Sequence, residues 1–378
     1  MKDDNLLIVS ETERDADLLY ALGMFVSDRL IYLRLRGRRR PCVLLPELAL
    51  QRSKRLLKQC RVLSLAVYQR RLGGNGRDSV GPAHIIREVL RENRVKKVQV
   101  PPSFPLGLAR DLRRLKVKLK VRDEPLFRER ECKSADEIKK ISAALTMAEV
   151  GLAEGLLALR NAKIGRDRRL HHHNAPLTSE KLRAIINTAI LQAGGCPPHT
   201  IVAGGRQACD PHEPGHGPLR ANEPIVIDVF PRSRKTGYYG DITRTVVRGR
   251  ASEGVRRLYE TVRCAQELAF ARIQAGVTGA QLHQIVQQFF EHEGFPTRSR
   301  NGRPEGFFHG IGHGVGLELH EYPRIGAGSQ DKLCCGNVVT IEPGLYYSNL
   351  GAVRLEDVVL VTTREARNLT KFEKTLEL

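Results

Sequence analysis

Apolar residues in the first third of the chain follow two alternating patterns. Short runs of consecutive leucine and β-branched residues predict buried strands, and apolar positions three or four residues apart predict helices. Strands are predicted within Leu6–Val9, Leu30–Leu35, Pro41–Leu45, Arg61–Val67 and Lys97–Val100, and helices within Ala16–Leu22, Ala49–Cys60 and Ala83–Asn93. This alternation is typical of a domain with layers of helices against a sheet.

The pattern changes near Glu131. Ser134 and Glu137 have the spacing of a capping box, and the apolar residues that follow mark one face of a long helix extending to Arg160. We therefore expect an N-terminal domain at residues 1–130 and a C-terminal domain at residues 131–378. Further helices are predicted after Thr178, at 252–275 and at 278–293.

Carboxylates interrupt the most strand-like segments of the C-terminal domain. Asp228 lies inside Ile225–Phe230, and Asp241 opens a second β-branched run beyond a polar turn at 231–237. The two runs predict a hairpin that brings both aspartates together. A buried aspartate is costly unless its charge is paired or bound to a metal, so a salt-bridged pair and a metal site are both consistent with this stretch.

The downstream sequence favours the metal site. Glu342 and Glu356 repeat the pattern of a carboxylate within a strand-like run, and a glycine-rich segment contributes His309, His313 and His320. Four buried acids in one domain repel each other unless cations neutralise them. Oxygen ligands with one imidazole suit divalent transition metals, and two such ions can catalyse amide hydrolysis.

The composition narrows the class of protein. The 378 residues carry a net charge of +20, and residues 1–130 hold 30 Lys and Arg against 15 Asp and Glu. Few aromatic residues accompany the arginines at 34–40, so a solvated basic face is favoured over a nucleic-acid-binding surface. Because no apolar run approaches the ~18–20 residues of a membrane span and no signal-peptide pattern is present, we expect a cytoplasmic protein without a membrane segment.

The eight cysteines form no Cys-x-x-Cys pair. We expect free and mainly buried thiols, and neither a zinc-cysteine site nor a redox role.

The spacing of the four carboxylates and His313 resembles the pita-bread metallopeptidase family, which includes Xaa-Pro aminopeptidases, prolidases, methionine aminopeptidases and creatinase. The segments Gly312-His-Gly-Val-Gly316 and Ile341-Glu-Pro-Gly344 carry the resemblance most specifically. It covers nearly the whole chain. It implies an α+β protein, in which a C-terminal pita-bread domain follows a smaller α/β creatinase-type N-terminal domain.

The resemblance also implies two divalent metal ions, Mn²⁺ first, with Co²⁺, Fe²⁺ or Zn²⁺ as alternatives. Asp228 matches the bidentate ligand of one ion, Asp241 and Glu356 match the bridging carboxylates, and His313 and Glu342 match the remaining ligands of the second ion.

Other positions match residues that act on the substrate. The catalytic candidates are His212, His309, His320, which matches the histidine that stabilises the intermediate, and Arg354. The substrate-binding candidates are Arg324, which matches an anchor for a peptide carboxylate, and Tyr346.

The function implied is hydrolysis of Xaa-Pro bonds through a metal-bridging hydroxide, at the N-terminus of peptides or in dipeptides, by a homodimer. The substrate is then a peptide with proline at its second position. The N-terminal domain disfavours a methionine aminopeptidase, and the intact ligand set disfavours creatinase. A non-peptidase hydrolase or lyase on the same fold and a basic nucleic-acid-binding protein remain the alternatives.

One feature departs from the family pattern. Asp228 and Asp241 are thirteen positions apart, two more than is usual in the family. Two extra residues keep the same faces inward because side chains alternate along a strand. We therefore expect the turn at 232–235 to alter the rim of the site and leave the metal ligands in place.

Overall fold

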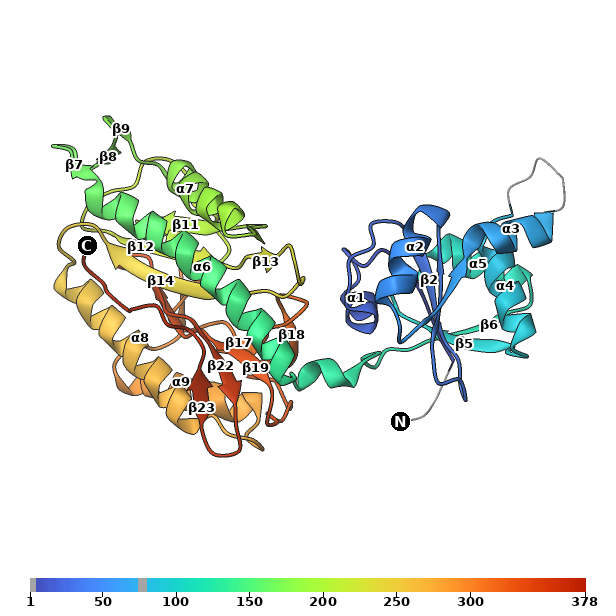
Figure 1. Cartoon of the computed structure of the whole chain (residues 1–378). Helices are drawn as coiled ribbons and strands as arrows, with labels where there is room; N and C mark the ends of the chain where they lie inside the picture. Colours follow the sequence, from blue (N-terminus) through green and yellow to red (C-terminus); the bar gives the residue numbers. More distant parts are fainter. Residues whose placement is uncertain (1–4, 74–79) are drawn as a thin grey trace. The chain divides into compact units, whose positions relative to one another are not determined.

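The computed structural model describes residues 5–73 and 80–378, which form two compact units, Met1–Arg128 and Glu129–Leu378 (Figure 1). The sequence pattern had placed this boundary between residues 130 and 131.

The N-terminal unit contains one mixed sheet with the strand order β4-β3-β2-β1-β5-β6. Its strands are β1 (Leu6–Ser10), β2 (Leu30–Arg34), β3 (Cys42–Leu45), β4 (Arg61–Ser64), β5 (Lys97–Val100) and β6 (Lys118–Val121), and its helices are α1 (Ala16–Leu22), α2 (Glu47–Leu56), α3 (Leu65–Gly73), α4 (Pro82–Glu92) and α5 (Leu106–Arg114). Leu6 and Ile8 belong to one hydrophobic cluster and Leu7 and Val9 to another, because successive side chains of a strand point to opposite faces.

The sequence pattern predicted most of this unit and missed one junction. The run Arg61–Val67 was predicted to be a single strand, but β4 ends at Ser64 and α3 begins at Leu65. The hydroxyl of Ser64 accepts a hydrogen bond of 3.3 Å from the Val67 amide, which is the contact that caps a helix N-terminus. Helix α5 and strand β6 were not predicted.

The C-terminal unit surrounds its strands with four long helices. These are α6 (Ala135–Asn161), α7 (Ser179–Gln192), α8 (Glu253–Arg272) and α9 (Gly279–His292). Helix α6 packs against α7 and against the central hairpin, and α8 packs against α9 and the late strands of the unit (Figure 1). The predicted capping box is present, because Ser134 accepts from the Glu137 amide and Glu137 accepts from the Ser134 amide.

Two small sheets of this unit hold the strands nearest the site. One has the order β11-β12-β14 and the other the order β18-β17-β19-β22-β23. Their strands are β11 (Ile201–Gly204), β12 (Pro224–Val229), β14 (Ile242–Val247), β17 (Gly312–Gly314), β18 (Glu321–Ile325), β19 (Val338–Ile341), β22 (Asp357–Val361) and β23 (Ala366–Asn368).

The shorter elements include two 3-10 helices and the strands of four separate small sheets. They are η1 (Arg128–Glu131), η2 (Gly205–Cys209), β7 (Lys163–Ile164), β8 (Leu170–His172), β9 (Ala175–Pro176), β10 (Gly195–Cys196), β13 (Arg232–Ser233), β15 (Arg298–Arg300), β16 (Arg303–Glu305), β20 (Gly344–Tyr347) and β21 (Gly351–Arg354).

The sequence was expected to contain no segment long and apolar enough to cross a membrane, but helix α6 meets both criteria. Its best window has a mean hydropathy of 1.4, and half of that window is buried within the protein. A Cβ atom added at Gly155 would come within 2.7 Å of the Ile186 side chain on α7, so the two helices approach closely at this glycine. Packing against α7 and against the central hairpin buries this half of the window.

The cysteines are free, but the prediction that they are mainly buried is wrong. Cys42 and Cys60 are buried, whereas Cys132, Cys196, Cys334 and Cys335 are exposed.

Candidate metal centre

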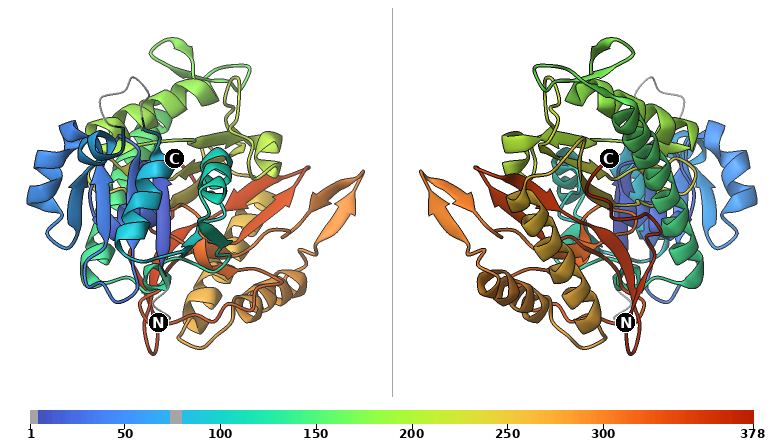
Figure 2. Two further views of the ribbon diagram at one scale, coloured as in Figure 1. Left: turned by 90° about the vertical axis from the view of Figure 1, so that its right-hand side faces the viewer. Right: turned by 90° about the vertical axis from the view of Figure 1, so that its left-hand side faces the viewer.

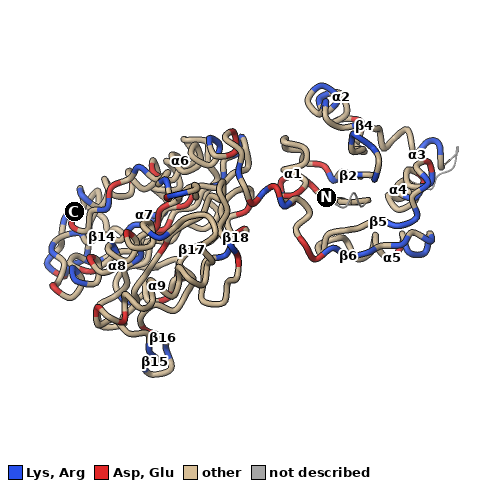
Figure 3. Tube along the Cα trace, turned by 90° about the horizontal axis from the view of Figure 1, so that it is seen from below, with Lys and Arg blue, Asp and Glu red and all other residues tan. Residues whose placement is uncertain are grey.

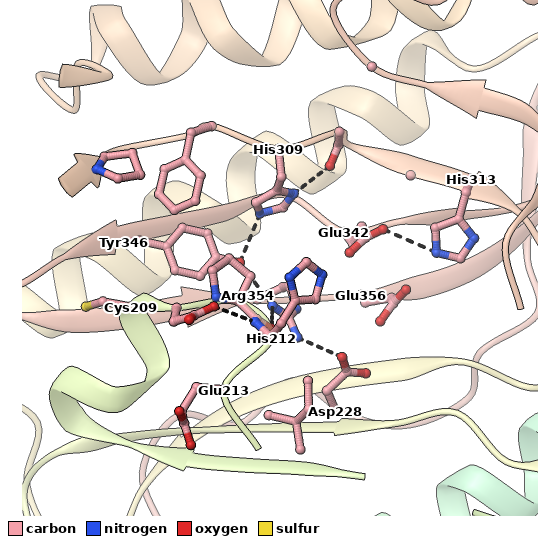
Figure 4. Close-up of a pocket in the computed structure, with 18 of the residues that line it drawn as sticks. Cys209, His212, Glu213, Asp228, His309, His313, Glu342, Tyr346, Arg354 and Glu356 are labelled. Atoms are coloured by element: carbon pink, nitrogen blue, oxygen red, sulfur yellow. Dashed lines mark hydrogen bonds and ion pairs between the residues drawn. The ribbon is translucent and has the colours of Figure 1, made fainter. Parts of the chain in front are cut away.

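One cavity of the C-terminal unit, with a volume of 1620 Å³, is lined by every residue that the sequence assigned to the site. The set comprises His212, Asp228, Asp241, His309, His313, His320, Arg324, Glu342, Tyr346, Arg354 and Glu356. Several of them point toward one another from facing strands (Figure 4).

The pairing of β12 with β14 brings the two aspartates to the same face. Asp228 pairs with Thr243, and Asp241 precedes Thr243 by two positions. Side chains two positions apart in an extended chain share a face, so Asp241 and Asp228 both point into the cavity. The predicted hairpin is therefore the element that assembles the first half of the site.

The two glutamates lie at breaks between strands, which corrects the expectation that they sit inside strands. Glu342 follows the last residue of β19, and Glu356 lies between β21 and β22. Glu356 is held against β14 by an isolated bridge to Thr243, whose hydroxyl donates to Oε2 of Glu356 at 2.7 Å. The break lets Glu356 leave its own sheet and approach the carboxylates of the other.

His313 comes from β17 and completes a compact group with two acids. Its Nε2 atom lies 3.4 Å from Oε1 of Glu342 and 3.8 Å from Oδ2 of Asp241. One ligand atom each from Asp241, His313 and Glu356 fall within 4.8 Å of one another, and all three residues are buried. This grouping is suited to a metal ion.

The glycines beside His313 are required by the close approach of neighbouring strands. A Cβ atom at Gly312 would clash with the Thr340 carbonyl oxygen, and one at Gly314 would clash with the Tyr322 carbonyl oxygen. The glycine-rich sequence therefore lets β17 fit between β18 and β19 with the imidazole directed into the cavity.

Burial and mutual repulsion raise the pKa values of the acids. Burial, and then the charges of the neighbouring carboxylates, raise the pKa of Asp241 and of Glu356 well above their ordinary values. Burial is also the largest cause of the shift of Glu342, whose pKa rises to about 7. Burial, followed by the charge of His320, lowers the pKa of His313 to about 3, so this imidazole is neutral and able to bind a metal.

These residues fit divalent metal ions. Oδ2 of Asp228 accepts from Arg354 at 2.7 Å, whereas Oδ1 is buried and has no hydrogen-bond partner among the described residues. A buried carboxylate oxygen without a donor, beside three acids whose charges repel each other, is an environment that a cation stabilises.

A chain of hydrogen bonds connects Asp228 to His309. Arg354 donates to the hydroxyl oxygen of Tyr346 at 3.1 Å, and that hydroxyl lies 2.9 Å from Nε2 of His309. Nδ1 of His309 lies 2.6 Å from the Gly310 carbonyl oxygen, which can only accept. Burial, and then the charge of Arg354, lower the pKa of His309 to about 4, so the ring is neutral. Its Nδ1 therefore carries the proton, and Nε2 accepts from Tyr346.

The remaining predicted residues lie at more open positions of the cavity. The ring of His320 is 4.4 Å from the ring of His313, and Arg324 pairs with His313 across β17 and β18. His320, Arg324 and His212 are all exposed. Groups in these positions are accessible to a substrate bound at the acids.

Sequence reasoning missed a buried ion pair directly behind the site. Arg244 is 1% exposed and donates to Oδ1 of Asp357 and to the main-chain carbonyl of Glu356, both at 2.7 Å. Burial raises the pKa of Asp357, but Arg244 and Lys374 outweigh it and the pKa is lowered. The adjacent acids Glu356 and Asp357 were the available signal, because adjacent side chains of an extended segment point in opposite directions and cannot both bind the same metals.

The extra turn between the aspartates does not reach the rim, which corrects the expectation for residues 232–235. The residues that line the cavity include Phe230 and Asp241 but none between them. Instead, β13 pairs with β10, and Tyr238 donates to Glu137 of α6 at 2.9 Å. The longer hairpin therefore packs outward against the helical layer.

Removing a ligand that belongs to the compact group should lower the metal content. We expect Asp241→Ala and Glu356→Ala to retain less than half of the metal bound by the wild type after dialysis, because each removes a carboxylate shared by the group. Elemental analysis of the purified proteins measures this. Glu213→Ala removes another acid that lines the cavity and serves as the control; equal metal loss in all three variants would contradict the assignment.

The metal-free protein should lose stability as the pH rises from about 6.5 to 8.5. The folded state holds protons on Glu342, Asp241 and Glu356 that the unfolded state has released, so stability falls with rising pH until each folded pKa is reached and then levels off. Unfolded histidine is half protonated at about pH 6.5, so the buried neutral rings of His309 and His313 offset part of this loss at the start of the window. We expect a net loss in the free energy of unfolding across this window, carried mainly by Asp241 and Glu356, whose pKa values are raised the most.

Denaturant titrations with and without metal measure this effect. A metal-loaded sample should show little of the loss, since bound cations favour the ionised acids. A metal-free protein with the same stability at both pH values would contradict the electrostatic account.

Comparison with known proteins agrees with this geometry. The model of metallopeptidase family M24 matches residues 139–363. The Xaa-Pro dipeptidase of Pyrococcus horikoshii is 30% identical over 288 residues, which cover 75% of each protein. The Xaa-Pro dipeptidase of Pyrococcus furiosus is 38% identical over 178 residues, which span 47% of this chain and only 48% of that relative.

Solved structures resemble the chain over nearly its full length. The X-Pro aminopeptidase from Thermotoga maritima has a TM-score of 0.82 at 24% identity and covers 100% of this chain and 98% of its own. The prolidase from Pyrococcus furiosus has a TM-score of 0.79 at 25% identity, with 98% and 97% covered. These likenesses confirm the predicted α+β fold with a pita-bread domain. Because the family model matches more than half of the chain, this protein belongs to metallopeptidase family M24.

Proposed function

We propose that this protein is a metal-dependent peptidase that hydrolyses the bond between an N-terminal residue and proline. The observation that carries the proposal is the convergence of Asp228, Asp241, His313, Glu342 and Glu356 in one cavity. The names of the curated relatives, Xaa-Pro dipeptidases, support the choice of bond.

Two divalent ions held by these five residues would supply an activated water and stabilise negative charge on the carbonyl oxygen. In this proposal Asp241 and Glu356 would be shared by the two ions, Asp228 would hold one of them, and His313 and Glu342 would hold the other. Arg354 holds Asp228 in place through its 2.7 Å hydrogen bond, which leaves Oδ1 free for a cation.

The histidines around the acids have separate roles in the proposed reaction. His320 lies beside His313 and is open to the cavity, so it is placed to donate a hydrogen bond to the oxygen that becomes negative. The chain from Arg354 through Tyr346 fixes the ring of His309 against the cavity wall. A fixed, neutral imidazole beside Phe308 offers a rigid surface for a proline ring.

Three finer proposals extend this one. Arg324 would bind the carboxylate of a short peptide, and the preference between dipeptides and longer peptides then depends on how the rest of the cavity is used. Mn²⁺ is the proposed native metal. A cytoplasmic homodimer is the proposed state of the protein.

The direct test compares an Xaa-Pro dipeptide with longer Xaa-Pro peptides. The protein is stripped with a chelator and reloaded with Mn²⁺, Co²⁺ or Zn²⁺, and release of the N-terminal residue is measured. We expect no cleavage by the stripped protein and restored cleavage after reloading, because the acids need the cations to bind and activate water. Failure to cleave any Xaa-Pro peptide with any of the metals would refute the proposal and direct attention to a different hydrolytic or lyase reaction on this fold.

Replacement of His320 separates catalysis from metal binding. We expect His320→Ala to keep its metals and to lose about 10²-fold in kcat, as removal of one donor to a negative oxygen does. Elemental analysis and steady-state kinetics measure the two quantities. His216→Ala, an exposed histidine that does not line the cavity, should change neither. Loss of metal in His320→Ala would instead mean that this residue is a ligand.

A further inference from the structure

A short arginine-rich hairpin projects from the C-terminal unit (Figures 2 and 3). Its residues Arg300, Asn301 and Arg303 line the cavity. The hairpin consists of β15 and β16, joined by Asn301 and Gly302. Both turn residues have positive φ, at 52° and 75°, which is the conformation of a type I′ turn. This turn fixes the register, so that Arg300 lies directly opposite Arg303.

The base of the hairpin is neutralised and anchored. Arg298 pairs with Glu305 at 3.2 Å and lies over the ring of Tyr347 at 5.7 Å. Glu305 is 3% exposed and also accepts from the Ser348 hydroxyl at 2.6 Å. The hydrogen bond from Ser348 is the largest cause of the lowered pKa of Glu305, with smaller contributions from Arg298 and Arg300. The only acid of the hairpin is therefore paired with Arg298 and Ser348 and does not neutralise the arginines at the tip.

The tip of the hairpin concentrates uncompensated positive charge. Like charges directly opposite each other on paired strands destabilise a hairpin, and Arg300 and Arg303 have this arrangement. Both are exposed, and neither forms an ion pair within 4.0 Å of an acid in the part of the chain that the structure describes. Arg206 of η2 is a third exposed arginine of this kind.

All three arginines line the same cavity as the metal ligands. Its volume of 1620 Å³ exceeds the ~300–1,000 Å³ of ordinary small-ligand pockets, so a dipeptide at the acids would leave much of the cavity unfilled. The position of the arginines within this space indicates that an anionic part of the substrate reaches them.

We propose that Arg300 and Arg303, assisted by Arg206, form an anion subsite for the C-terminal carboxylate of peptides that continue beyond proline. The inference rests on the proposed function and assigns its substrate class: Xaa-Pro peptides of three or more residues, ahead of dipeptides. The free amino end of a peptide is a cation and is repelled by three guanidinium groups, so the hairpin meets the carboxyl end. Guanidinium groups bind carboxylates well because two parallel N–H donors match the two oxygens.

Peptides that differ in one charge test the subsite. The series is Ala-Pro followed by zero to three glycines, each with a free carboxylate or an amide at its C-terminus. For at least one of the longer peptides, we expect the KM of the acid to be about tenfold lower than that of the amide, since two guanidinium groups contact it. In R300Q/R303Q the acid and the amide of that longer peptide should have equal KM values. Any preference for the acid form of the dipeptide should remain, because Arg324 would bind that carboxylate.

The hairpin between β22 and β23 offers a matched control. R364Q/R367Q removes two exposed arginines that do not line the cavity, and it should keep the wild-type ratio. R300Q/R303Q should also melt no lower than the wild type, because it removes repulsion between opposed charges. Equal KM values for acids and amides in the wild type, or an unchanged ratio in R300Q/R303Q, would overturn the subsite.

A binding measurement separates this inference from the proposed function. Calorimetry with Pro-Gly-Gly and its amide requires no turnover. Tighter binding of the acid by the wild type, lost in R300Q/R303Q, supports the subsite even if no Xaa-Pro peptide is cleaved. Equal binding of the acid and the amide overturns the subsite even if peptides are cleaved.

Discussion

Repulsion among buried carboxylates is the constraint on which the C-terminal unit depends. Asp241 and Glu356 are 3% and 2% exposed and lie together with Asp228 and Glu342 on the wall of one cavity. Such a group is unstable as four anions, so it must hold protons or bind cations. The raised pKa values describe the first state, and the ligand geometry around His313 provides for the second.

The surrounding fold keeps the acids in place against this repulsion. Thr243 holds Glu356 by its hydroxyl and its main chain, and Arg354 holds Asp228. Behind them, Arg244 donates hydrogen bonds to the Glu356 carbonyl and to the Asp357 side chain, and the three residues form one buried network. The helices α6 to α9 cover the outside of these strands. These hydrogen bonds hold the ligand atoms close together, which favours cation binding because little reorganisation is needed.

Two kinds of arginine lie in and around the cavity. Arg354 and Arg244 are buried, paired and structural. Arg300 and Arg303 are exposed at the tip of a hairpin whose single acid serves its base. The first kind compensates charges that the protein itself buries. The second kind has no such partner in the described chain and is available to a ligand. Most of the excess positive charge lies in residues 1–130. In the C-terminal unit, however, a few exposed arginines are positioned where they can bind a ligand.

The sequence by itself determined which chemical groups the site contains. Helical spacing located most helices, and apolar runs located many of the longer strands. The carboxylates and histidines within apolar segments indicated a metal centre, because such residues are costly to bury without a partner. The same patterns could not place strand breaks. Glu342 and Glu356 lie where strands end, and β4 gives way to a helix at Ser64. Those boundaries depend on contacts between segments far apart in the chain, such as the bridge between Thr243 and Glu356.

Tertiary structure alone decided the outward packing of the extra turn at 232–235, the pairing of Arg244 with Asp357, and the meeting of Arg206 with the hairpin arginines at one cavity. Periodicity records which face of an element is buried, but it carries no information about which distant element covers that face. That choice is made when the whole unit packs.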